Sequence, residues 1–311
     1  MPALSNPLLL KWFNAFMRLS HRALAPLVPH ASDIRLPLRG ECRAGQVYLV
    51  GAGSGDAELL TLKAARLLMQ ADAVVYDRLV GDDVLALIPN GSERYYVGKA
   101  RGHHSVPQAE IGALMVKLAR EGKSVVRLKG GDPAVFARMG EELDALAAAE
   151  IPAAMVPGIT AASAAAACMG IPLTDRGHAQ QLRFVTAQLC REDGTPDWAS
   201  LARKDETLVF YMGLSKVRAI CHGLREAGLP DEWPIMLVAN ASQPEQQSLV
   251  GSLADMPEKL AATPLPSPLL DCGGQRGAKS CHNARYPSHP CLLCTANHAL
   301  TAGFAVHVLR F

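Results

Sequence analysis

The sequence has few aromatic residues, little net charge and no long apolar run. Aromatic residues make up 5% of the 311 positions, and the formal net charge is +2. No apolar run is long enough to span a membrane. No basic stripe with interleaved aromatic side chains is present, and so small a charge is no argument for nucleic-acid binding. The composition therefore predicts neither a membrane protein nor a nucleic-acid-binding protein, although a local basic cleft for an acidic small molecule is compatible with it.

The residues that are abundant are typical of a globular α/β protein. Hydrophobic residues make up 49% and charged residues 19% of the chain, which supplies ample apolar side chains for a core. Ala, Leu and Val are frequent, a bias that suits helices packed on mostly parallel strands. The length predicts about two domains.

The eight cysteines fall into two groups. The first group is scattered singly along the chain, and we expect its members to be reduced in a cytoplasmic protein; they are Cys42, Cys168, Cys190 and Cys221. The second group crowds near the C-terminus and consists of Cys272, Cys281, Cys291 and Cys294. A zinc site there is an open alternative, but a single C-x-x-C pattern is weak support, so we expect no metal.

Residues 1–44 form an N-terminal extension in this interpretation. Residues 8–27 place apolar side chains on one helical face beside Lys11, Arg18 and Arg22. A surface or transit-like helix is one interpretation. We expect a poorly ordered extension, because chain ends are often loosely held.

From residue 45 to residue 157 the chain alternates between strand-like and helix-like patterns. This alternation predicts a mainly parallel sheet with helices on its faces. The predicted strands are 47–50, 73–76, 94–97 and 124–128. The predicted helices are 58–70, 82–88, 108–121 and 140–150.

A change of domain is predicted at residues 152–158, and a second α/β domain at residues 158–270. Its elements are separated by longer connections. The predicted strands are 182–186, 207–212, 235–239 and 248–253, and the predicted helices are 160–169 and 216–226.

A glycine-rich turn, Gly-Ala-Gly-Ser-Gly-Asp at 51–56, follows the first predicted strand. Glycines let the backbone approach a ligand closely, and the next helix start offers unpaired backbone N–H groups. A dinucleotide site is one interpretation. The G-x-G-x-x-G spacing is not met, however, because Asp56 stands where the last glycine belongs.

Polar residues follow the next strands. Asp77 stands at a strand end, where open α/β sheets bind ligands, and it could accept a proton or orient a substrate. Alternatively it caps the following turn or pairs with Arg78. Lys99 and Arg101 follow another strand end and are candidates to bind carboxylates.

Three further turns share this arrangement. They are the Gly-Gly-Asp turn at 130–132, the turn into an Ala-rich helix at 157–163, and Tyr-Met-Gly at 211–213. Together the turns predict a ligand cleft rich in backbone donors and acceptors. Such a cleft suits a ligand that carries its own reactivity, such as S-adenosylmethionine.

The motifs VGAGSGDAELLTLKA, YDRLV, RLKGGDP, VPGITAAS and LVFYMGL appear in that order. Through these motifs, residues 46–268 resemble the tetrapyrrole methylase family. Within it, the chain is similar to uroporphyrinogen-III C-methyltransferases and to the methylating half of siroheme synthases. The resemblance implies two α/β domains with S-adenosylmethionine in the cleft between them. It also implies a cytoplasmic homodimer that converts uroporphyrinogen III to precorrin-2 by two successive methylations.

The resemblance also implies roles for particular residues. Asp77 matches the catalytic acid/base and Lys99 a lysine of the cleft. Carboxylate groups of the substrate would be bound by Arg78, Arg101 and Arg127. The cofactor contacts would be Ser54, Gly130, Gly131, Asp132, Val135, Thr160, Ala161, Met212 and Ala241.

The sequence departs from the family pattern at several positions. Ser54 replaces a proline, Asp175 replaces a histidine and Ala241 replaces a glycine, while Met139 adds bulk near the second glycine turn. Reduced activity is one consequence of these departures. Three competing hypotheses are a methyltransferase for a later corrinoid precursor, a nucleotide-dependent oxidoreductase, and a non-catalytic remnant.

The C-terminal segment 271–311 departs most from the family pattern. After Leu270 the family continues with an apolar strand, and here a Cys/His-rich tail follows. We interpret this tail as the product of a reading-frame change. We expect the strand to be lost and a sheet edge to be exposed as a result.

Overall fold

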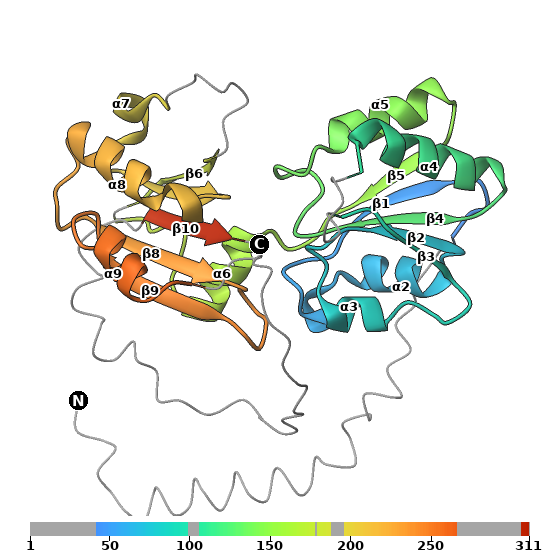
Figure 1. The fold of residues 1–311 in the computed structure, drawn as a ribbon, viewed down its shortest axis with the longest axis horizontal. Helices are drawn as coiled ribbons and strands as arrows, with labels where there is room; N and C mark the ends of the chain where they lie inside the picture. Colours follow the sequence, from blue (N-terminus) through green and yellow to red (C-terminus); the bar gives the residue numbers. More distant parts are fainter. Residues whose placement is uncertain (1–41, 99–105, 178, 188–195, 266–305, 311) are drawn as a thin grey trace, which may run out of the picture. The chain divides into compact units, whose positions relative to one another are not determined.

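The computed structural model describes residues 42–98, 106–177, 179–187, 196–265 and 306–310. All of them lie in the unit Glu41–Phe311. They form two five-stranded sheets with helices packed on them (Figure 1). The predicted α/β class is confirmed.

The first sheet has the strand order β3-β2-β4-β1-β5, and every neighbouring pair is parallel. Its strands are β1 Val47–Gly51, β2 Ala73–Tyr76, β3 Glu93–Tyr96, β4 Val125–Lys129 and β5 Ala153–Val156. Its helices are α2 Leu62–Gln70, α3 Asp82–Ala86, α4 Gln108–Arg120 and α5 Met139–Ala148, and a short 3-10 helix spans Ala57–Leu59.

Helices cover both faces of this sheet. Neighbouring strand residues point to opposite sides, so each strand contributes side chains to both faces. Val74 packs in the cluster that contains Leu67 and Leu68 of α2. Val75 packs in the cluster that contains Met115 and Leu118 of α4. Figure 1 shows α2 and α3 on one face and α4 and α5 on the other.

For the helix predicted at 58–70, the helical period places Leu59, Leu62, Ala65, Leu68 and Met69 on the apolar side, and this was partly wrong. Leu68 is buried as expected, but Leu62 and Met69 are 55% and 49% exposed, and Ala64 and Leu67 are buried. The cause is the break between the 3-10 helix and α2, which changes the phase of the helical pattern. Strand β5 was not predicted as a strand.

The second sheet has the order β6-β7-β10-β8-β9, parallel except for the antiparallel pair β8 and β9. Its strands are β6 Gln181–Thr186, β7 Glu206–Tyr211, β8 Pro234–Ala239, β9 Gln247–Ser252 and β10 Val306–Arg310. Its helices are α6 Ala161–Met169, α7 Trp198–Leu201, α8 Val217–Glu226 and α9 Met256–Ala262, and a 3-10 helix spans Leu214–Lys216.

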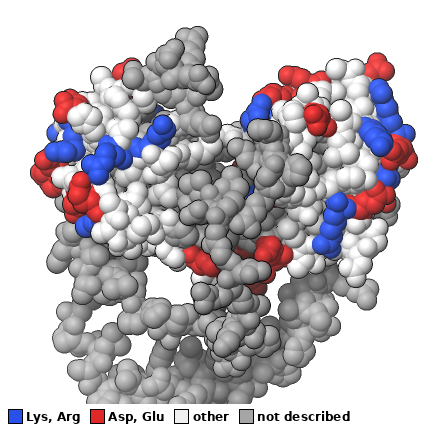
Figure 2. Space-filling view, in the orientation of Figure 1, with Lys and Arg blue, Asp and Glu red and all other residues white. Residues whose placement is uncertain are grey.

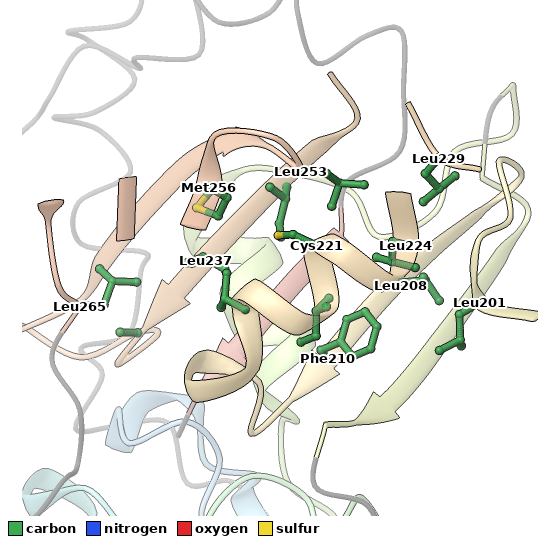
Figure 3. Packing of buried hydrophobic residues seen from close by; sticks show 14 residues of the cluster. Leu201, Leu208, Phe210, Cys221, Leu224, Leu229, Leu237, Leu253, Met256 and Leu265 are labelled. Atoms are coloured by element: carbon green, nitrogen blue, oxygen red, sulfur yellow. The ribbon is translucent and has the colours of Figure 1, made fainter. Parts of the chain in front are cut away.

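Alternation again places a core on each face of the sheet. Phe210 and Leu237 pack against Cys221 and Leu224 of α8 on one face (Figure 3). The neighbouring residues of the same strands pack with the alanines of α6 on the other face. Ala side chains let α6 lie close to the sheet.

The expected exposed sheet edge after loss of a strand was wrong. The backbone of β10 pairs with β7 on one side and with β8 on the other, in parallel register. Residues 306–310 therefore occupy the position between β7 and β8. A strand inside a sheet pairs on both sides and leaves neither neighbour with open backbone groups.

On the face shown in Figure 2, exposed Lys and Arg side chains are interspersed with Asp and Glu. Across the described ranges, no helix is long and apolar enough to cross a membrane.

Candidate active site

A pocket of about 560 Å³ lies where strand ends and glycine turns come together. This is within the size range of small-molecule sites in proteins. It brings together nine of the residues that the sequence singled out, which are Asp77, Arg78, Arg127, Gly130, Gly131, Asp132, Val135, Thr160 and Met212.

The two glycine turns are joined through their backbones. The N–H of Gly53 donates to the carbonyl of Gly131 at 3.1 Å, and the N–H of Gly131 donates back to Gly53 at 2.7 Å. A Cβ on Gly51 would lie 2.5 Å from the nitrogen of Gly158 and 2.7 Å from the oxygen of Gly131. Glycine is required here because only bare backbone fits this close approach.

Asp132 ties these turns together through its carboxylate. One oxygen accepts from the N–H of Ala134 at 2.8 Å, and the other accepts from the N–H of Gly158 at 3.0 Å. Both contacts are to backbone donors, so the carboxylate fixes the shape of the turn beside Gly130 and Gly131.

Asp77 caps the following turn, as one interpretation of its sequence position had it, and its ion-pair partner is Arg127. Its Oδ1 accepts from the N–H of Leu79 at 3.0 Å, which caps the turn. Its Oδ2 accepts from Nη2 of Arg127 at 3.2 Å. The Asp77 side chain is 26% exposed and lines the pocket, so the carboxylate is held in place and is accessible to a ligand.

Behind Asp77 lies a buried ionic cluster. The carboxylate of Glu142, which is fully buried, lies 3.0 Å from Nε of Arg127 and 2.8 Å from Nζ of Lys129. Gln108 Nε2 also donates to Glu142 at 3.0 Å. Burial, with Arg127 beside it, lowers the pKa of Lys129.

The wall of the pocket that carries Thr160 and Tyr211 is aromatic and polar. The two hydroxyls share a hydrogen bond of 2.7 Å. The ring of Phe136 lies 5.0 Å from the ring of Tyr211, in a tilted arrangement. Burial raises the pKa of Tyr211, which keeps its hydroxyl protonated at neutral pH.

Three non-glycine residues of the pocket have a left-handed backbone, which are Phe136, Arg138 and Met212, with φ of 50°, 53° and 58°. Phe136 and Met212 are each 42% exposed. Such conformations cost free energy and are concentrated at ligand sites. The backbone conformations of Phe136 and Met212 place two large apolar side chains at the pocket surface, where these side chains can contact flat apolar groups of a ligand.

Three predicted cofactor contacts do not line this pocket. Ala161 and Ala241 are buried, at 1% and 6% exposure. Ser54 is 5% exposed, and its hydroxyl shares a 2.6 Å hydrogen bond with that of Ser242. Lys99 and Arg101 lie outside the described residues.

The sequence reasoning missed other residues that line the pocket. Several lie in the strand-end motifs, next to residues that were chosen, so adjacency to such a motif was the available signal. These residues are Leu79, Gln108, Lys129, Phe136, Ala137, Arg138, Tyr211, Leu214 and Ser215.

Within the part of the chain that the structure describes, no group of three or more His, Cys, Asp or Glu side chains could hold a metal ion. The cysteines described there, Cys42, Cys168 and Cys221, are free thiols. The cysteines of the C-terminal tail lie outside the described residues.

The fold and the pocket define an α/β protein with a small-molecule site at the ends of its strands. The family model of tetrapyrrole (corrin/porphyrin) methylases matches residues 46–257. The chain belongs to this family.

Within the family, the chain is similar to two groups of relatives. A siroheme synthase of Acinetobacter baylyi is 51% identical over 233 residues, which is 74% of this chain and 50% of that protein. A uroporphyrinogen-III C-methyltransferase of Paracoccus denitrificans is 50% identical over 234 residues, which is 75% of this chain and 82% of that protein. The chain thus spans about half the length of the siroheme synthases it matches.

Solved structures agree with these relatives. The uroporphyrin-III C-methyltransferase of Thermus thermophilus, in complex with S-adenosylhomocysteine, is 44% identical with a TM-score of 0.60. That match covers 69% of this chain and 91% of that one. A cobalt precorrin-4 methyltransferase is 27% identical with a TM-score of 0.64, over 71% of this chain and 91% of its own.

Proposed function

We propose that this chain is an S-adenosylmethionine-dependent C-methyltransferase that converts uroporphyrinogen III to precorrin-2. The observation that carries the proposal is the pocket itself. It joins a backbone cradle at Gly130 and Gly131 to a held carboxylate, Asp77, in a chain about 50% identical to uroporphyrinogen-III C-methyltransferases. We also propose a cytoplasmic homodimer.

The residues of the pocket fit S-adenosylmethionine. A Cβ on Gly130 would lie 2.7 Å from Cβ of Leu79, and Gly131 has φ of 69°, so this turn requires glycine at both positions. Thr160 adds a hydroxyl, and Val135 and Met212 add apolar surface. This combination suits a nucleoside with an amino-acid tail. Ser54, Ala161 and Ala241 would support this cradle from positions behind it.

S-adenosylmethionine, when bound, supplies an electrophilic methyl group on a sulfonium centre. The pocket must hold an electron-rich pyrrole carbon in line with that methyl group, which is a positioning task. The large side chains of Phe136 and Met212 offer surface on which a flat macrocycle can rest.

The methylated macrocycle must release a proton, and Asp77 is the carboxylate suited to accept it. Asp132, the other carboxylate lining the pocket among the described residues, has both oxygens engaged by backbone N–H groups. Asp77 has one oxygen on a backbone N–H and the other on Arg127. Each oxygen of either carboxylate therefore accepts one hydrogen bond and retains a lone pair, so the choice of Asp77 rests on its match to the catalytic position of the family.

The substrate's carboxylates need cationic partners at the pocket. Arg78 and Arg138 line it, and the Arg138 side chain is 64% exposed. We propose that these side chains, together with Arg101 and Lys99, bind the substrate's carboxylates. Asp175, whose negative charge at this position departs from the family, is exposed and caps its own turn through the N–H of Gly177.

A later corrinoid precursor is the alternative substrate. The solved cobalt precorrin-4 methyltransferase shares the fold but is 27% identical, against 44% for the uroporphyrin-III enzyme. The difference in identity favours uroporphyrinogen III.

The test is turnover with S-adenosylmethionine and enzymatically generated uroporphyrinogen III, followed by mass spectrometry. We expect a product that has gained two methyl groups, and loss of that product in Asp77→Asn. Asp205→Asn is the matched control, because Asp205 is exposed and pairs with Arg203 at the surface. Binding of NAD in place of S-adenosylmethionine, measured by calorimetry, would contradict the proposal.

A further inference from the structure

Glu142 takes no direct part in the proposed chemistry, yet it is fully buried directly behind the pocket. Oε1 accepts from Nε of Arg127 and from Nε2 of Gln108, both at 3.0 Å. Oε2 accepts from Nζ of Lys129 at 2.8 Å. A buried carboxylate is costly unless it is paired and hydrogen bonded, and here three donors from two elements satisfy it.

The place of Glu142 depends on a close contact between α4 and α5. A Cβ on Gly112 would lie 2.8 Å from Cβ of Ala145. Gly112 stands one turn beyond Gln108 on α4, and Ala145 stands about one turn beyond Glu142 on α5. The close approach therefore brings Gln108 within hydrogen-bond distance of Glu142.

Arg127 connects Glu142 to Asp77. Its Nε donates to Glu142 and its Nη2 donates to Asp77 at 3.2 Å. Its Nη1 donates to the carbonyls of Leu128 at 3.0 Å and Val75 at 3.5 Å. Four of the roughly five N–H groups of a guanidinium are thus committed. Arg127 is 3% exposed, so its guanidinium is held in place between the two carboxylates.

We propose that Glu142 is a positioning residue of the active site, which sets the place and the ionisation of Asp77 through Arg127 and holds Lys129 beside the glycine turn. This rests on the proposed function of the pocket. Arg127 then serves to orient the base, in addition to lining the pocket.

Charge balance explains why an acid is needed at position 142. Arg127 and Lys129 are two buried cations on alternate residues of β4. Glu142 neutralises one of them and leaves the other to balance Asp77. Without Glu142, two cations would face Asp77, which would favour its ionised form and weaken it as a base.

Other ionisable groups also affect the ionisation of Asp77, and they must be the same in the wild type and in a Glu142 variant when the two are compared. Among the described residues, those that line the same pocket are Arg78, Arg127, Lys129, Asp132, Arg138 and Tyr211. None of these side chains is substituted in a Glu142 variant, so a change in the titration of Asp77 there reports the loss of the Glu142 carboxylate together with its effect on Lys129, its ion-pair partner.

The first experiment requires no turnover. The side-chain carboxyl of Asp77 is titrated by NMR in protein labelled with ¹³C-aspartate, and assigned with Asp77→Asn. In Glu142→Gln we expect the titration midpoint of Asp77 to fall by about half a pH unit or more. Glu206→Gln is the matched control, because Glu206 is also a buried glutamate paired with an arginine, 3.0 Å from Arg183. Its side chain is not among the residues that line the pocket.

The second experiment measures kinetics. In Glu142→Gln we expect kcat to fall by about tenfold or more. The Kd of S-adenosylhomocysteine should stay within about twofold, because the hydrogen bonds that join the glycine turns do not involve Glu142. The acidic limb of the pH profile of kcat should move to lower pH. Glu206→Gln should change none of these values.

The outcomes separate the two proposals. If the wild-type chain does not methylate uroporphyrinogen III, the proposed function fails, and the NMR titration still tests the role of Glu142. If Glu142→Gln matches Glu206→Gln in both titration and kcat, Glu142 is only structural and the inference is overturned. If Glu142→Gln does not fold, Arg127→Lys replaces it, since lysine keeps the charge but cannot reach both carboxylates. A wild-type kcat in Arg127→Lys would equally overturn the inference.

Discussion

The hydroxyl of Thr160, at the start of α6, lies 2.7 Å from the hydroxyl of Tyr211, at the end of β7. The N–H of Ala162 also donates to the Tyr211 oxygen, at 3.4 Å. Tyr211 is 2% exposed, so its polar tip is satisfied inside the protein. This bond fixes the start of α6 relative to β7, the strand that Met212 follows.

The first prediction concerns this hydrogen bond. Tyr211→Phe leaves the Thr160 hydroxyl and the Ala162 N–H without their partner, and we expect a loss of about 1 kcal/mol in the free energy of unfolding. Thr160→Val should cost a similar amount. In the double variant the losses should not add, because both remove one bond. Urea unfolding of all four proteins measures this, and simple additivity would contradict a shared bond.

Asp132 provides the second prediction. An asparagine there keeps one acceptor oxygen but turns its NH₂ group toward the N–H of either Ala134 or Gly158, which now contact the carboxylate. Two donors facing each other would distort the turn at Gly130 and Gly131. We expect the Kd of S-adenosylhomocysteine, measured by calorimetry, to rise by about tenfold in Asp132→Asn, equal to about 1.4 kcal/mol.

The control for that measurement is Asp144→Asn, an exposed carboxylate on α5. It changes the net charge by the same amount but does not line the pocket. An equal loss of affinity in both variants would point to a general charge effect and contradict a local role for Asp132.

The third prediction uses the contrast between two thiols. Cys221 is 1% exposed on α8, and burial raises its pKa to about 11. At pH 8 only about 0.1% of such a thiol is in the reactive thiolate form. Cys168 is exposed. Iodoacetamide at pH 8 should therefore label Cys168 in the folded protein and label Cys221 only after denaturation.

Peptide mapping by mass spectrometry assigns each label to its cysteine. Cys168→Ser should remove the early label at that position and leave Cys221 unlabelled. Raising the pH toward 11 should increase the labelling of Cys221, because its thiolate population grows. Fast labelling of Cys221 at pH 8 would contradict the buried environment.

Most strands of both sheets could be predicted from the sequence because each is a short run of apolar residues between turn signals. Val74 and Val75 alternate between two cores, as a strand covered on both faces requires. The strand ends then indicated Asp77, Gly130 and Met212, which line one pocket. This part of the site follows from local pattern and from the geometry of parallel sheets.

Contacts between distant residues could not be predicted in the same way. Arg127 meets Asp77 from 50 positions away, and Ser54 meets Ser242 from 188 positions away. The helix register of α2 depended on a break after Leu59, which no periodicity reveals. Glu142 stands in a helix rich in Ala and Glu, where nothing local distinguishes a buried glutamate from an exposed one such as Glu141.

The last prediction concerns β10. The backbone of β10 pairs with both β7 and β8, whose residues Leu208, Phe210, Ile235 and Leu237 belong to one core cluster. A chain that ends at residue 305 would leave open backbone groups on both strands and weaken that core. We expect Tm to fall by about 10 °C or more, corresponding to several kcal/mol, and soluble protein to decrease.

Deletion of Phe311 alone is the control for β10, because it shortens the chain but leaves residues 306–310 in place. Its Tm should match that of the full chain. Thermal unfolding by circular dichroism and size-exclusion chromatography compare the three proteins. If the chain ending at residue 305 kept the full Tm, then residues 306–310 would not be needed between β7 and β8. The two halves of the second sheet would then have to be held together by α6 and α8 alone, since these helices share the two core clusters with both β7 and β8.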